Sequence, residues 1–178
     1  GVMFCGGFMS DMTGTKALYL EEQCKKRGQS YLRFDYTGHG QSSGEFRQGS
    51  IGAWKQDALD IFDALATDRT ILVGSSMGAW IALLVARERA RHVQGLVGIA
   101  SAPDFTERLI WQRLNADQKE QLTQNGVFYA PSCYGEEPYP ITKALIEEGR
   151  NHLLLDDTVA VGAQVRLLHG TEDRDVPW

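Results

Sequence analysis

Short apolar runs alternate with longer helical patterns along most of the chain. The apolar runs have few polar interruptions, as expected for strands buried on both faces, and they cover residues 1–8, 30–34, 70–73, 93–100 and 164–168. The segments between them place apolar residues on one helical face or form continuous helix-forming runs, and they cover residues 11–27, 50–66 and 77–89. This alternation favours right-handed crossovers. We therefore expect an α/β fold with a mainly parallel sheet and helices on both faces.

The helix over 50–66 has the clearest pattern, because Ser50 precedes it as an N-cap residue. Its predicted apolar stripe consists of Ile51, Trp54, Ala58, Ile61, Phe62 and Leu65. A stripe of this width indicates one face packed on the sheet.

The alternation breaks at Pro103, and the chain is irregular from there to about Leu155. Aromatic residues and prolines are mixed in this section, namely Trp111, Phe128, Tyr129, Pro131, Tyr134, Pro138, Tyr139 and Pro140. The only helix predicted in it covers 142–148 and ends at Gly149. We interpret 1–178 as a single domain with a core over 1–102 and 156–178 and a cap insertion over about 103–155. The cap would cover the C-terminal strand edge, where open α/β sheets bind ligands; the alternative is an extra helical layer packed on the side.

Composition excludes several classes of function. The chain has 178 residues, is 43% hydrophobic and 23% charged, and carries a net charge of −5 with acids and bases interspersed. Because acids and bases are interspersed, the sequence predicts no basic surface that would bind nucleic acid or an anionic membrane. No segment is typical of a membrane span. The three cysteines Cys5, Cys24 and Cys133 are far apart and lack metal-ligand spacing, which favours reduced thiols. We expect a cytoplasmic protein, or a mitochondrial one if the source is a eukaryote. The composition leaves the oligomeric state open.

The strongest chemical signal is the sequence Gly74-Ser75-Ser76-Met77-Gly78, which has the form G-x-S-x-G. An apolar strand precedes it and a helix-forming run follows it. This is the context of a nucleophile elbow, a sharp strand-to-helix turn that exposes the central serine. The start of the following helix would favour negative charge beside Ser76.

Three other interpretations of this turn compete with the nucleophile elbow. A strand–turn–helix corner or an anion-binding loop remains the alternative. A phosphate-binding P-loop requires a longer glycine-spaced loop closed by Lys-Ser or Lys-Thr, and no lysine lies near Ser76. The P-loop is therefore excluded.

Four motifs occur in an order that resembles the α/β-hydrolase superfamily. They are the Gly6-Gly7-Phe8 turn, D-x-x-G-H-G-x-S over 35–42, the elbow at Ser76, and H-G-x-x-D-x-x-V-P over 169–177. Residues 7–17 and 149–155 resemble, more narrowly, small serine esterases and thioesterases related to the mitochondrial abhydrolase that cleaves acyl-glucuronides and removes fatty acyl groups from protein cysteines. The resemblance covers essentially the whole chain and fixes no single substrate.

The resemblance implies roles for four residues. Ser76 would be the nucleophile and Asp173 the acid that orients a catalytic histidine. The backbone N–H groups of Phe8 and Met77 would form the oxyanion hole. Ser76 would then attack the acyl carbonyl of a small ester or thioester, and water would release the acid from the acyl-enzyme. No cofactor, metal or nucleic-acid partner is implied.

The catalytic histidine is not identified. In this fold it follows the acid along the chain, and no histidine follows Asp173. The loop residue His39, the strand-edge residue His92, the cap residue His152 and the turn residue His169 all have structural interpretations.

Two explanations for the missing base stand beside each other. The first is that the domain extends beyond both ends of this chain, because the sequence opens inside an apolar run and stops soon after Pro177. The second is a non-catalytic protein of the same fold that binds a ligand or partner in the same crevice. Sequence beyond Trp178 would discriminate between the two.

The assignment of Asp173 also has alternatives. Asp104, just past the fourth strand, is a second candidate for the triad acid. Asp173 could also be one more acid in a solvated loop with Glu172 and Asp175. The H-G-x-x-D spacing favours Asp173.

Overall fold

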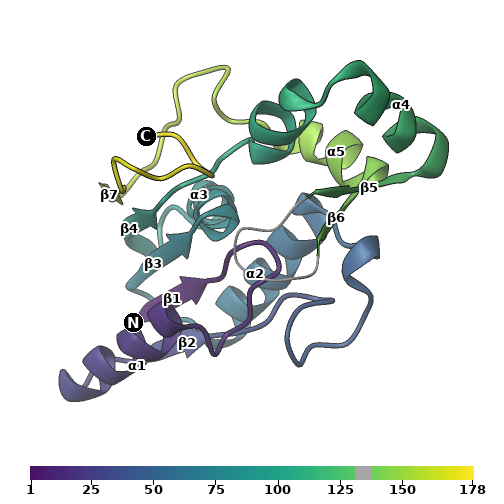
Figure 1. Cartoon of the computed structure of the whole chain (residues 1–178). Coiled ribbons are helices and arrows are strands. Elements are labelled where there is room, and N and C mark those ends of the chain that lie inside the picture. The colour runs from purple at the N-terminus through teal and green to yellow at the C-terminus, as the bar shows by residue number, and fades with distance from the viewer. Residues whose placement is uncertain (131–137) are drawn as a thin grey trace.

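The computed structural model describes residues 1–130 and 138–178. Its main sheet contains five strands in the order β2-β1-β3-β4-β7, and every neighbouring pair is parallel. The strands are β1 (Val2–Cys5), β2 (Tyr31–Arg33), β3 (Thr70–Ser75), β4 (Val93–Ile99) and β7 (Gln164–Leu168). The helices between them are α1 (Thr15–Lys26), α2 (Ile51–Leu65) and α3 (Met77–Glu88) (Figure 1). The predicted parallel sheet is confirmed.

Both faces of the sheet are covered because successive strand residues point to opposite sides. On one side, Val2, Phe4 and Val73 pack with buried residues of α1. On the other side, Met3 and Leu72 belong to the larger core, together with buried residues of α2 and α3. Helices on both faces, as predicted, therefore enclose the centre of the sheet.

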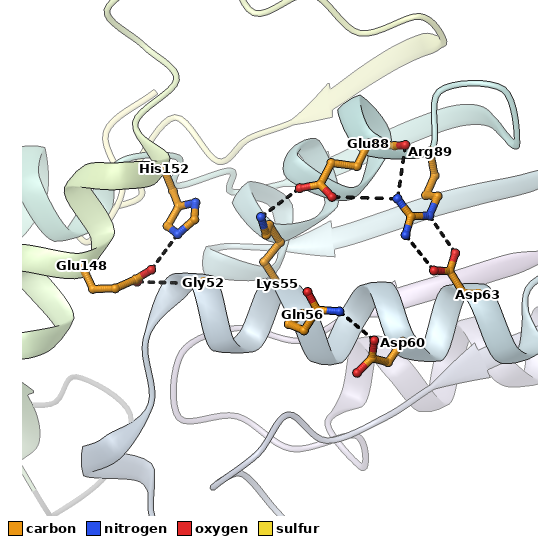
Figure 2. Close-up of polar contacts among 9 residues, drawn as sticks. All are labelled: Gly52, Lys55, Gln56, Asp60, Asp63, Glu88, Arg89, Glu148 and His152. Atoms are coloured by element: carbon orange, nitrogen blue, oxygen red, sulfur yellow. Dashed lines mark hydrogen bonds and ion pairs between the residues drawn. The ribbon is translucent and has the colours of Figure 1, made fainter.

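Helices α2 and α3 are joined by ion pairs along their outer surfaces. Lys55 lies 2.8 Å from Glu88, and Arg89 lies 2.7 Å from Asp63 (Figure 2). Exposed pairs of this kind contribute about 0–1 kcal/mol each, so the buried faces dominate the packing.

The predicted stripe of α2 is largely correct and fails at its end. Ser50 caps the helix as expected, since its hydroxyl accepts a hydrogen bond from Ala53 N. Leu65, however, is 58% exposed, and Leu59 is buried instead. Leu65 is the last residue of the helix, where the face packed on the sheet has ended.

The segment between β4 and β7 is more regular than the sequence indicates. It contains η2 (Thr106–Ile110), η3 (Trp111–Arg113), α4 (Ala116–Asn125), α5 (Lys143–Gly149) and η4 (Arg150–His152). It also contains an antiparallel hairpin of β5 (Val127–Ala130) and β6 (Tyr139–Thr142). These elements gather at the upper right of Figure 1, away from α1, and enclose a small core of Leu122, Ile141 and Ile146. The prediction of an irregular section is wrong, while the helix predicted over 142–148 is confirmed. Pro131, Cys133 and Tyr134 lie outside the described residues.

One edge of the main sheet is formed by β7, whose outer residues are open to solvent. Leu167 is 67% exposed and Leu168 is 58% exposed, and Trp178 near them in sequence is 82% exposed.

Among the described residues, no helix has both the length and the apolar composition that a membrane span requires.

Candidate active site

Ser76 occupies the turn between β3 and α3 with a strained backbone. Its φ of 53° and ψ of −120° lie outside the regions that non-glycine residues ordinarily adopt. Two backbone hydrogen bonds fix this turn against β4 and the loop that follows β4. Ser76 N donates to Ile99 O at 2.9 Å, and Ala102 N donates to Ser76 O at 3.3 Å. The predicted elbow geometry at the carboxyl end of the strand is therefore confirmed.

The two glycines of the motif permit the close approach of three elements. A β-carbon at Gly74 would lie 2.4 Å from Ala79 Cα, so the strand could not pass the start of α3. A β-carbon at Gly78 would lie 2.1 Å from the carbonyl oxygen of Cys5 at the end of β1. The G-x-S-x-G spacing thus fixes the helix against two strands as well as forming the turn.

The turn after β1 lies directly against the elbow. A β-carbon at Gly7 would lie 3.6 Å from Ser76 Cβ and 3.4 Å from Ser75 O, and Phe8 follows Gly7 in the chain. Met77 is the first residue of α3, so its N–H has no partner within the helix. Neither the Phe8 N–H nor the Met77 N–H donates to another described residue. The two predicted oxyanion donors therefore have no competing acceptor among the described residues.

Asp35, the first residue of D-x-x-G-H-G-x-S, supports this turn. Its carboxylate accepts hydrogen bonds from Met12 N at 2.6 Å and from Gln41 N at 2.9 Å. Gly40 has a φ of 46°, and a β-carbon there would lie 2.2 Å from the Asp35 carboxylate. Asp35 therefore connects its own loop to the segment that follows Phe8. The motif contained this signal, but the role of its aspartate was not predicted.

Asp173 lies in an ordered turn after β7. Its Oδ1 accepts from Asp175 N at 3.0 Å and from Val176 N at 2.9 Å. Its Oδ2 lies 4.0 Å from His169 Nε2, too far for a hydrogen bond, and His169 Nε2 instead lies 2.8 Å from Val176 O. Because β3 and β7 belong to the same parallel sheet, Asp173 and Ser76 follow the carboxyl ends of their strands. Oδ2 accepts no hydrogen bond from the described residues.

Asp104 has a different environment. It is fully buried, and its two carboxylate oxygens accept hydrogen bonds from Leu154 N and Leu155 N, each at 2.8 Å. Arg108 Nε lies 3.7 Å from the same carboxylate. Asp104 therefore fastens the chain after η4 to the segment that follows β4, and no described histidine contacts it.

Among the described residues, neither His39 nor His92 is hydrogen-bonded to Ser76. His39 is buried among Tyr36, Phe46 and Trp54, and burial lowers the pKa of its imidazole. His92 is 52% exposed and lies just before β4, at the opposite end of the sheet from Ser76. No described residue is hydrogen-bonded to the Ser76 hydroxyl.

His152 contacts residues of α5 and α3, and its partner Glu148 contacts α2. Its Nε2 lies 2.7 Å from Glu148 Oε1, and the other oxygen of Glu148 accepts from Gly52 N at 3.0 Å (Figure 2). The carbonyl oxygen of His152 accepts from Trp80 Nε1 at 3.0 Å. His152 therefore acts in packing, as the sequence analysis favoured.

Two surface hollows lie beside η4, and Ser76 lines neither of them. One of about 370 Å³ lies between α2, α3 and η4 beside Lys55 and His152. The other, of about 490 Å³, lies beside Arg108 and Arg150. The elbow and the Phe8 turn, rather than cavity volume, identify the candidate site.

The sequence of this chain matches a known protein family. The sequence model of the family described as "Serine aminopeptidase, S33" matches residues 2–127, which is most of the chain. The chain belongs to this family of α/β-hydrolases.

Two longer curated proteins align with the whole length of this chain. The chain is 41% identical to human "Palmitoyl-protein thioesterase ABHD10, mitochondrial" and 43% identical to its Bos taurus counterpart. Each alignment covers 100% of this chain and 58% of the relative, so the chain spans little more than half the length of these curated relatives.

Solved structures of α/β-hydrolases superpose on nearly every residue. Mouse alpha/beta hydrolase domain-containing protein 10 has a TM-score of 0.91 at 38% identity, covering 100% of this chain and 71% of that one. An Agrobacterium vitis S4 protein, provisionally assigned as a hydrolase, has a TM-score of 0.95 at 44% identity, covering 99% and 70%. The predicted α/β-hydrolase fold is confirmed.

Proposed function

We propose that this protein is a serine hydrolase that cleaves carboxylic esters or thioesters through an acyl-enzyme on Ser76. The observation that carries the proposal is the strained Ser76 turn, with a φ of 53°, pressed against the Gly7-Phe8 turn. Strain of this kind persists where the surrounding structure requires it, and it is frequent at active sites. The relatives named palmitoyl-protein thioesterase support the same chemistry.

In the proposed reaction, Ser76 Oγ forms a bond to the acyl carbonyl carbon and loses its proton to a general base. The carbonyl oxygen becomes an oxyanion that accepts hydrogen bonds from the Met77 and Phe8 N–H groups. The base then protonates the departing alkoxide or thiolate, leaving the acyl group on Ser76. Water attacks this ester in the same way, and the free acid leaves. Asp173 Oδ2 would orient the base.

The general base itself is proposed to be a histidine other than the four in these 178 residues. None of the four is hydrogen-bonded to Ser76 in the described part of the chain, and each has another neighbour: Thr37 O for His39, Asp68 for His92, Glu148 for His152 and Val176 O for His169. Triad order also puts the histidine after Asp173. Because the chain spans 58% of the length of these relatives, the activity is proposed for the whole protein and not for these 178 residues alone.

We propose thioesters of long acyl chains as the first substrates to test, because the relatives' name specifies a palmitoyl-protein thioesterase. The region over about 103–155 would act as the cap over this site. A cytoplasmic location, or a mitochondrial one in a eukaryote, remains our proposal. The word mitochondrial in the relatives' name and the free thiols of Cys5 and Cys24 support it.

The test is labelling with a fluorophosphonate probe, which reacts with activated serines. The complete protein should label and should hydrolyse an acyl thioester, and Ser76→Ala should abolish both. Ser75→Ala is the matched control, because it removes the neighbouring hydroxyl from the same turn and should retain both activities. Labelling that survives Ser76→Ala would place the nucleophile elsewhere.

The alternative is a non-catalytic protein that binds a ligand or partner in the same crevice. It is favoured by one observation, the absence of hydrogen-bond partners for the Ser76 hydroxyl among the described residues. A complete protein that neither labels nor hydrolyses, while its fold is intact, would support this alternative.

A further inference from the structure

The planar peptide that carries the Phe8 N–H joins Gly7 to Phe8, and its two ends are held in different ways. Its turn is closed by Ser10, which donates from both N (3.2 Å) and Oγ (2.8 Å) to Gly7 O. Met9, the next residue, has a φ of 52°. Phe8 itself makes no backbone hydrogen bond with any described residue. Ser10 therefore holds the Gly7 end of this peptide, whereas the position of the Phe8 end depends on how the Phe8 side chain is packed.

The Phe8 ring lies among four other rings. Ring centroids lie 5.0 Å away for Phe46, 5.5 Å for Phe105, and 6.0 Å for both Trp54 and Tyr139. All four pairs have the edge-to-face geometry that aromatic side chains favour. Such contacts determine the orientation of the Phe8 ring and, through Cα, that of its peptide.

Three of these rings pack with the main hydrophobic core, and the fourth belongs to the β5–β6 hairpin. Phe46 is in η1 (Phe46–Gln48), Trp54 is in α2 and Phe105 immediately precedes η2, whereas Tyr139 begins strand β6. Phe8 packs against both the main core and the small cap core of Leu122, Ile141 and Ile146. Tyr139 is therefore the aromatic link between the cap hairpin and the oxyanion turn.

The hairpin is in turn fastened to the element that carries Phe46. Arg47 donates a hydrogen bond to the Tyr129 hydroxyl, and its guanidinium lies 5.5 Å from the centre of the Tyr129 ring. Tyr129 pairs with Pro140 in the hairpin, next to Tyr139. Neighbouring residues of η1 thus hold the hairpin and contact Phe8, which gives the cap a defined position against the Phe8 ring.

We propose that Tyr139 is a positioning residue, whose ring fixes the Phe8 backbone N–H for oxyanion binding through its contact with the Phe8 ring. This inference rests on the proposed function. A donor displaced by about 1 Å loses much of its effect, and loss of one oxyanion donor costs about 100- to 1,000-fold in kcat. Because the oxyanion exists only after attack, loss of the Tyr139 ring should act on kcat rather than on KM.

The experiment compares Tyr139→Leu with Tyr139→Phe in the complete protein. Tyr139→Leu should lower kcat for thioester hydrolysis about 10- to 100-fold with a much smaller change in KM. It should weaken binding of a trifluoromethyl ketone, which adds to a serine as a hemiketal oxyanion, by a similar factor. Tyr139→Phe keeps the ring and should behave as the wild type. Tyr19→Leu makes the same change on the exposed face of α1, where Tyr19 is 61% exposed, and should alter neither quantity.

A double-mutant cycle with Phe8→Leu separates positioning from general destabilisation. If Tyr139 acts through the Phe8 ring, Tyr139→Leu should have little further effect on kcat when Phe8→Leu is already present. Fully additive effects would overturn the inference, and so would a loss of kcat in Tyr139→Phe equal to that in Tyr139→Leu. Tyr139→Met replaces Tyr139→Leu in the same comparisons if the leucine variant does not fold.

The outcome for the wild type separates this inference from the proposed function. If the wild type neither labels at Ser76 nor turns over substrate, both the proposed function and the positioning role of Tyr139 are overturned. A wild type that does both, with a Tyr139→Leu variant indistinguishable from Tyr19→Leu, overturns the positioning role alone.

Discussion

Gly78 packs against Cys5 so closely that a β-carbon at position 78 would lie 2.1 Å from the Cys5 carbonyl oxygen. The obstacle is backbone at the end of β1, which cannot move aside as a flexible side chain could. We expect Gly78→Ala to lower the free energy of unfolding by at least about 2 kcal/mol, since it forces α3 away from the sheet. Denaturant unfolding followed by circular dichroism measures this change.

Gly162→Ala provides the control for that substitution. A β-carbon there would meet only Ala90 Cβ at 3.7 Å, an ordinary contact. Its stability should stay within about 0.5 kcal/mol of the wild type. Equal effects at positions 78 and 162 would contradict the close-packing explanation of the elbow.

Asp173→Asn should lower activity, whereas Asp104→Asn should lower stability. In the triad precedent, asparagine in place of the acid costs about 10⁴-fold in kcat while the geometry persists, so Asp173→Asn should lower kcat by a comparable factor. Asp104→Asn should instead lower the free energy of unfolding by about 1–3 kcal/mol. The new amide can accept from only one of Leu154 N and Leu155 N, and it directs a donor at the other.

The measurements are kcat and the unfolding free energy of both variants. A folded Asp104→Asn variant with activity lost as completely as in Asp173→Asn would show that the acid assignment is wrong.

None of the four histidines should serve as the general base. We expect the isolated 178-residue chain to hydrolyse a nitrophenyl ester at no more than about a thousand times the rate of the uncatalysed reaction in water. This is the residual rate enhancement of enzymes that lack their triad. In the complete protein, His92→Gln, His152→Gln and His169→Gln should label at Ser76 at rates within about threefold of the wild type. Turnover by the 178-residue chain that Ser76→Ala removes would refute this prediction.

The parts of the fold set by local chemistry could be predicted from the sequence. The elbow is one such part, because Gly74, Ser76 and Gly78 specify the turn and its crowding within five residues. The strands are another, since their burial on both faces produces unbroken apolar runs. Helix α4 also had local signals, an Asn115–Gln118 capping box and Gly126 in the left-handed region, but it was missed because the helix has few apolar residues.

Other features depend on contacts between segments far apart in the chain. Asp104 is a carboxylate at the end of a strand, and only the fold shows that both its oxygens bind backbone some 50 residues away. The β5–β6 hairpin contains prolines that disfavour strands, and packing on Phe8 and η1 stabilises it. The pattern of residues alone therefore assigned Tyr139 to an irregular section.

His39 should make the stability of the protein depend on pH below neutrality. Burial among aromatic rings lowers the pKa of His39 below its ordinary value of 6.5, although Thr37 O, Asp35 and Asp57 partly offset this effect. The unfolded chain therefore binds a proton at a higher pH than the folded chain does. The contribution of His39 to stability is complete above about pH 6.5 and is lost as the pH falls through the interval between the unfolded and folded pKa values.

His39→Phe keeps a ring among Tyr36, Phe46 and Trp54 and removes the titration. Unfolding free energies measured from about pH 7.5 down to pH 5 should therefore fall more steeply for the wild type than for His39→Phe. Parallel curves for the two proteins would show that His39 does not titrate differently on folding.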